Sequence, residues 1–125
     1  MTTRAALALL VLAACFDPAS LGTPTGSVCP TDAPPTYDGF AKPFMAAYCT
    51  RCHASTLAPD QRHGAPSFHD FDTEYGIKGV ADHVDLTAAA GPDAINTRMP
   101  PDDPRPTVDE RRRLGEYLAC LVNAP

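Results

Sequence analysis

Cys49-Thr50-Arg51-Cys52-His53 is the most informative segment of this chain. Two thiols stand with two residues between them, and an imidazole follows the second thiol directly. At this spacing both sulfurs can bond one edge of a porphyrin while the adjacent histidine ligates the central iron. The pattern C-x-x-C-H is typical of covalent haem attachment, and it predicts one haem c held by Cys49, Cys52 and His53.

A C-x-x-C pair also occurs in disulfides, in zinc sites and in thioredoxin-like redox centres. A zinc site needs two further ligands, but the other cysteines, Cys15, Cys29 and Cys120, form no second closely spaced pair. A thioredoxin-like centre lies between a strand and a helix, whereas a helical pattern runs into Cys49 from its N-terminal side. Haem attachment therefore fits the sequence better than either alternative.

Length and composition favour one small helical domain. The chain has 125 residues with 14 prolines, 8 glycines and no tryptophan, and runs of β-branched residues with period two are scarce. A chain of this length buries only a modest apolar core, which a covalently held haem would enlarge. The formal net charge is −5 and basic residues cluster only at 111–113, so we expect no binding of nucleic acid.

The first residues resemble a bacterial lipoprotein signal peptide. Arg4 precedes an apolar run, 5–14, that is too short to span a bilayer as a mature helix. The run ends in Leu12-Ala13-Ala14-Cys15, which is similar to the lipobox that is cut just before its cysteine. The resemblance implies that residues 1–14 are removed and that a lipid on Cys15 anchors the protein on the periplasmic side of a bacterial membrane. Ordinary secretory cleavage is the alternative, and either route exports the chain.

Residues 15–36 separate this targeting segment from the domain expected at 37–125. They are rich in Pro, Thr, Gly and Ser and follow neither a helical nor a strand period. Such a composition is typical of a flexible linker. We expect it to hold the domain away from a membrane surface.

Two segments beside the C-x-x-C-H motif carry apolar residues at helical spacing. Residues 37–48 place an aromatic stripe on one face and lead directly into Cys49. Residues 73–90 also follow a helical period, but Gly76 and Gly79 weaken it, so either one helix or two short helices are expected.

The last segment predicts an amphipathic helix. Thr107 and Glu110 have the spacing of a capping box, which marks a helix start. Apolar residues then follow at i, i+3, i+4 and i+7: Leu114, Tyr117, Leu118 and Leu121. We expect Arg111 and Arg112 to face solvent.

The order of these features resembles that of class I mono-haem cytochromes c over about residues 37–124. The resemblance implies an all-α fold, in which small helices and long Pro/Gly-rich loops surround a covalently bound haem. It implies one-electron transfer between redox partner proteins, and no enzyme activity because both axial positions of the iron are filled. Two alternatives stay open: a haem-based sensor or catalytic subunit with a displaceable sixth ligand, and a haem-free lipoprotein adaptor or thiol oxidoreductase.

The same resemblance implies two further site residues. In this family a methionine on an irregular loop, often followed by proline, is the sixth iron ligand, and Met99-Pro100-Pro101 matches that pattern. The alternatives are an open position or one of three histidines: His63, His69 and His83. A proline carbonyl after the motif accepts the Nδ1 proton of the haem histidine in this family, which implies that role for Pro66.

The cysteines then divide between three uses. With Cys15 assigned to lipid and Cys49 and Cys52 to haem, Cys29 and Cys120 remain, and we expect them to form a disulfide. The first and last helices of the class I fold cross, which would bring the two sulfurs together. Two free thiols are the alternative.

Overall fold

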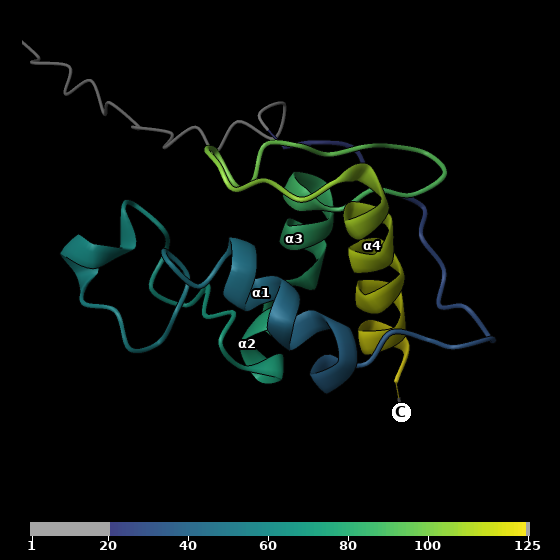
Figure 1. Ribbon diagram of the computed structural model, residues 1–125, viewed down its shortest axis with the longest axis horizontal. Helices are drawn as coiled ribbons and strands as arrows, with labels where there is room; N and C mark the ends of the chain where they lie inside the picture. The colour runs from purple at the N-terminus through teal and green to yellow at the C-terminus, as the bar shows by residue number, and fades with distance from the viewer. Residues whose placement is uncertain (1–20, 125) are drawn as a thin grey trace, which may run out of the picture.

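The computed structural model describes residues 21–124, so the predicted signal peptide 1–14 and Cys15 lie outside the described residues. The described part is helical and contains no strand, which agrees with the all-α expectation (Figure 1). Its elements are η2 (Tyr37–Ala41), α1 (Lys42–Tyr48), η3 (Pro59–Arg62), α2 (Glu74–Gly79), α3 (Ala81–Ala88) and α4 (Val108–Asn123). Within this part of the chain, no helix is long and apolar enough to cross a membrane.

The π-helical turn η2 runs directly into α1, and together they carry the predicted aromatic stripe. The Thr36 hydroxyl caps η2 by accepting the N–H of Gly39 at 3.1 Å. Pro43 lies in the first turn of α1, where a missing N–H leaves no helical hydrogen bond unmade. The inward face buries three side chains: Ala41, Phe44 and Met45. The helix ends at Tyr48, so it delivers the chain to Cys49.

Residues 73–90 form two short helices, α2 and α3. The helical conformation breaks at Val80, whose φ is −134°. Gly76 has a packing role besides weakening the helix, because a Cβ at this position would lie 1.8 Å from the carbonyl oxygen of Asp70. Glycine therefore lets α2 approach the preceding loop closely. The buried residues of the two helices include Ile77, Ala81, Val84 and Ala88.

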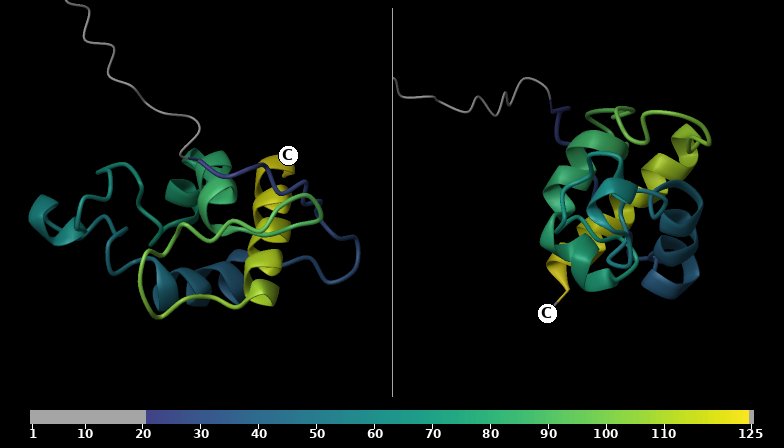
Figure 2. Two further views of the ribbon diagram at one scale, coloured as in Figure 1. Left: turned by 90° about the horizontal axis from the view of Figure 1, so that it is seen from above. Right: turned by 90° about the vertical axis from the view of Figure 1, so that its left-hand side faces the viewer.

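Helix α4 completes the core, and it contacts α2, α3 and η2 (Figures 1 and 2). The four predicted apolar positions are all buried: Leu114, Tyr117, Leu118 and Leu121. They pack in one cluster with Phe44 and Met45 of α1 and with Ile77 of α2. Burial of these side chains is the main favourable contribution to folding.

The prediction that Arg111 faces solvent is wrong. Arg111 is only 2% exposed, and its Nη1 donates to the carbonyl oxygens of Ala88 at 2.7 Å, Asn96 at 3.0 Å and Met99 at 2.8 Å. The 89–107 loop has few regular hydrogen bonds, so its buried carbonyls need a donor from elsewhere. Arg112 does face solvent and pairs with Asp109 at 2.8 Å.

Residues 21–36 differ from the flexible linker that their composition predicts. Thr25 is 1% exposed, and its hydroxyl donates to Asp85 of α3 at 2.6 Å. The Ser27 hydroxyl donates to the carbonyl of Ala90 at 3.2 Å, and Cys29 is joined to Cys120 by a disulfide, the predicted pairing. The small polar side chains of this segment therefore form hydrogen bonds to α3 and to the loop that follows it. The folded unit therefore extends at least to residue 21, and Figure 1 shows this segment passing beside α4.

Helix α4 begins with the predicted capping box. The Thr107 hydroxyl accepts the N–H of Glu110 at 3.2 Å, and the Glu110 carboxylate accepts the N–H of Thr107 at 2.8 Å. The backbone hydrogen bond from Thr107 is the main cause that holds the pKa of Glu110 below its ordinary value, and Tyr48 adds a side-chain hydrogen bond.

Glu110→Ala is therefore expected to destabilise the protein at pH 7, by about 1 kcal/mol for the loss of a capping interaction. A carboxylate with a lowered folded pKa stabilises above its unfolded pKa, and that stability is lost as pH falls through the folded pKa. Urea unfolding at pH 7 and below about pH 4 measures both effects. The difference between wild type and variant should shrink in acid; a difference independent of pH would contradict the assignment.

Candidate functional site

The C-x-x-C-H motif forms a turn at the C-terminal end of α1. The N–H groups of Cys52 and His53 both donate to the carbonyl of Cys49, at 3.1 and 3.0 Å. The thiols of Cys49 and Cys52 are free and half-buried, whereas Cys29 and Cys120 are paired. Burial raises the pKa of the Cys49 thiol to about 12. One turn thus holds two unpaired thiols beside an imidazole.

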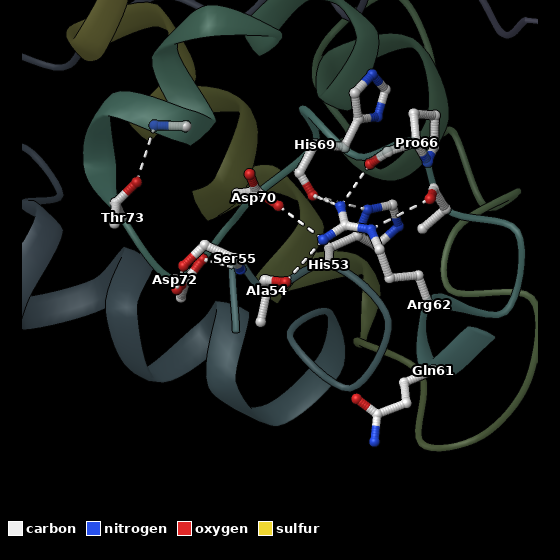
Figure 3. Close-up of polar contacts among 12 residues, drawn as sticks. His53, Ala54, Ser55, Gln61, Arg62, Pro66, His69, Asp70, Asp72 and Thr73 are labelled. Carbon is white, nitrogen blue, oxygen red and sulfur yellow. Dashed lines mark hydrogen bonds and ion pairs between the residues drawn. The ribbon is translucent and has the colours of Figure 1, made fainter. Parts of the chain in front are cut away.

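The His53 ring is held with one nitrogen free to bind a metal. Its Nδ1 lies 3.2 Å from the carbonyl oxygen of His69 (Figure 3). Because a carbonyl only accepts, Nδ1 carries the proton and Nε2 keeps its lone pair. Burial lowers the pKa of His53, which favours this neutral form. The ring also stacks on Phe71, with centroids 4.6 Å apart and planes at 18°.

The role predicted for Pro66 is corrected by this geometry. The carbonyl of Pro66 accepts from Arg62 Nη2 and from the N–H of His69, while the His69 carbonyl faces His53. The chain turns through η3 and then through left-handed conformations at His63 and Gly64, with φ of 51° and 87°. These turns bring a carbonyl three residues later in the sequence to the imidazole.

Met99 lies on the 89–107 loop, and its backbone is fixed on both sides. Its N–H donates to the carbonyl of Thr87 at 2.8 Å, and its own carbonyl accepts from Arg111 at 2.8 Å. The half-buried side chain packs against the core cluster, as Cys49 does. Met45, by contrast, is wholly buried within that cluster.

Arg51, between the two cysteines, ties the motif to the loop that carries Met99. Its guanidinium donates to the backbone carbonyls of Asp102 and Asp103, at 3.0 and 2.8 Å, and to the Asp102 carboxylate at 2.6 Å. The left view of Figure 2 shows the loop between α3 and α4 passing the end of α1. The structure therefore brings the Met99 loop alongside the turn of the two thiols.

The alternative histidines lie in different surroundings. His63 is exposed, whereas His69 is buried and meets His83 edge to face with centroids 4.9 Å apart. The His69 and His53 centroids are 6.1 Å apart. Among residues 21–124, no group of three or more His, Cys, Asp or Glu side chains is placed to hold a metal ion.

Two buried arginines beside the candidate site were not predicted from the sequence. Arg111 precedes Leu114 by three positions and Leu118 by seven, so helical spacing places it on the apolar face and was the available signal. Arg62 stands in a Pro/Gly-rich loop, where irregular backbone needs donors for its carbonyls. Apart from the spacing of Arg111, the pattern of apolar residues did not indicate that either arginine is buried.

Comparison of the chain with models of known families, with curated proteins and with solved structures finds no match. Any functional assignment therefore depends on the residues and contacts described above. The donor set fits a covalently held haem: two unpaired thiols, a neutral imidazole with its Nε2 free, and a thioether on a loop bonded to the same turn.

Proposed function

We propose that this protein carries single electrons on one haem c, attached through Cys49 and Cys52 and ligated by His53 and Met99. The observation that supports this most strongly is the turn at the end of α1. It holds two unpaired thiols and a neutral imidazole whose Nδ1 proton is already bonded to the His69 carbonyl. Histidines that bind haem iron or other metals ordinarily donate their other ring N–H to a carbonyl or carboxylate in this way.

The bound haem would supply an Fe(III)/Fe(II) couple, and methionine–histidine ligation raises its potential. The residues of the chain hold the ligands in place. The His69 carbonyl and the Phe71 ring fix the orientation of the His53 imidazole. Thr87 and Arg111 fix the backbone of Met99. Ligands held from several sides change position little between oxidation states, which suits electron transfer.

The remaining features belong to the same proposal. Cleavage before Cys15 and its lipidation would place the domain on the periplasmic side of a bacterial membrane, where it meets redox partner proteins. The acidic net charge of −5 favours partners with a basic face, although exposed charges act only over a Debye length of about 8–10 Å. Because His53 and Met99 would both be engaged in holding the haem iron, we propose no enzymatic activity.

Met99→Leu is the variant that tests the sixth ligand. Leucine keeps the side-chain volume and removes the sulfur, so the weak long-wavelength band of the oxidised protein should vanish and the ferrous form should bind carbon monoxide rapidly. Met45→Leu is the matched control, because this methionine is buried in the core cluster. It should leave both properties as in wild type.

Two results would contradict the proposal at different points. A long-wavelength band that persists in Met99→Leu would exclude Met99 as the ligand. Rapid binding of carbon monoxide by the wild-type ferrous protein at neutral pH would favour a sensor or catalytic haem protein with an open sixth position.

A further inference from the structure

We infer that Arg62 is a positioning residue for His53, because its guanidinium shares the His69 carbonyl with the imidazole and so sets how strongly that imidazole donates to a bound metal. The inference rests on the proposed function, since its main measurement is made on the haem-bearing protein. It concerns residues of this chain that the haem-attachment motif does not include.

Arg62 is 4% exposed, and each of its five N–H donors has an acceptor. Nη1 donates to the carbonyl of Ala54 at 2.7 Å and to the Asp70 carboxylate at 2.8 Å. Nη2 donates to the carbonyls of Pro66 and His69, and Nε donates to that of Ala65 at 3.3 Å. Figure 3 shows the guanidinium at the centre of these contacts, beside the His53 ring.

The His69 carbonyl is the point of contact between the two side chains. Arg62 Nη2 lies 3.1 Å from this oxygen, and His53 Nδ1 lies 3.2 Å from it. A cation bonded to the oxygen draws electron density away, which weakens the oxygen as an acceptor for the Nδ1 proton. The imidazole then keeps its proton more fully and donates less through Nε2. Weaker donation, together with a buried positive charge nearby, favours the reduced iron.

Arg62 forms an ion pair with Asp70. Variants of the two partners can therefore distinguish an effect of Arg62 on His53 from a purely structural role in the loop. Removing Arg62 frees the His69 carbonyl and leaves the Asp70 charge unpaired, and both changes favour oxidised iron. Removing the charge of Asp70 leaves Arg62 less neutralised, which favours reduced iron. A structural role alone would make both variants loosen the loop, and their potentials would move in the same direction.

The experiment measures reduction potentials of Arg62→Gln and Asp70→Asn by redox titration of the haem-bearing protein. At a fixed ambient potential, the ratio of oxidised to reduced protein should rise about tenfold in Arg62→Gln, which is about 59 mV for a one-electron couple. The ratio should fall in Asp70→Asn. Arg112→Gln and Asp109→Asn are matched controls, because they change an ion pair of the same 2.8 Å length that lies exposed on α4. They should leave the ratio as in wild type.

Potentials that move in the same direction in the two variants, or that do not move, would overturn the inference. If Arg62→Gln does not accumulate, Asp70→Asn decides alone, and a potential at or below that of wild type overturns it. A wild-type protein without haem would refute the proposed function itself. A haem-bearing wild type with unshifted variants would refute only the role of Arg62.

Discussion

Arg111→Leu is expected to lower the free energy of unfolding by about 3 kcal/mol, the scale for leaving buried hydrogen-bonding groups without a partner. The substitution removes the donor to three carbonyls, those of Ala88, Asn96 and Met99. Each buried carbonyl left without a donor costs about 1–3 kcal/mol, partly offset because the cation is no longer desolvated. The same change releases the loop that carries Met99, so the proposed sixth ligand should be lost more readily.

Denaturant unfolding and the long-wavelength band followed against pH measure these two effects. Arg112→Leu is the matched control. The Arg112 side chain is exposed, and within the described residues its one side-chain partner is Asp109. It should change stability by no more than about 0.5 kcal/mol. Equal behaviour of the two variants would show that Arg111 does not hold the loop.

Loss of the disulfide is the second large effect. The double variant Cys29→Ser/Cys120→Ser should lose about 2–5 kcal/mol of stability, because the bond closes a long loop in the unfolded chain. The two cysteines are 91 residues apart, so nearly the whole described domain lies within that loop. The N-terminal segment should also separate from α3 more readily, since Thr25 and Ser27 bond Asp85 and Ala90 close to the point where Cys29 is held.

Unfolding with and without a thiol reductant measures this effect, since thioether bonds to haem resist such reagents. Reductant should destabilise the wild type to the level of the double variant and should leave the double variant unchanged. Hydrogen exchange should show the amide of Thr25, which donates to Asp85 at 2.9 Å, exchanging faster in the variant. Equal stability of the wild type and the double variant in the absence of reductant would contradict a structural disulfide.

Local patterns predicted the helices well because each depends on neighbouring residues. The capping box at Thr107 and the apolar spacing that follows it define α4. Two glycines left one helix or two short helices open for residues 73–90, and the structure has two. The C-x-x-C-H motif is likewise a local pattern, and its residues occupy one turn.

The Cys29–Cys120 pairing was predicted, but other features that depend on distant contacts were missed. The polar composition of residues 21–36 is the same whether the segment is free or bonded to α3, and only the partners Asp85 and Ala90 decide between the two. The partner of His53 Nδ1 depends on how the loop through η3 turns back, so the motif could not distinguish Pro66 from His69. Arg111 was assigned by charge, although its spacing from Leu114 places it on the buried face.

The proposed covalent haem is tested most directly on mature protein made in a host that assembles c-type cytochromes. The measurement is the pyridine haemochrome spectrum of the denatured chain, together with its intact mass. The account predicts one haem per chain that stays attached after denaturation and acid extraction, and none in Cys49→Ser/Cys52→Ser. A colourless wild-type chain with the mass of the polypeptide alone would contradict it.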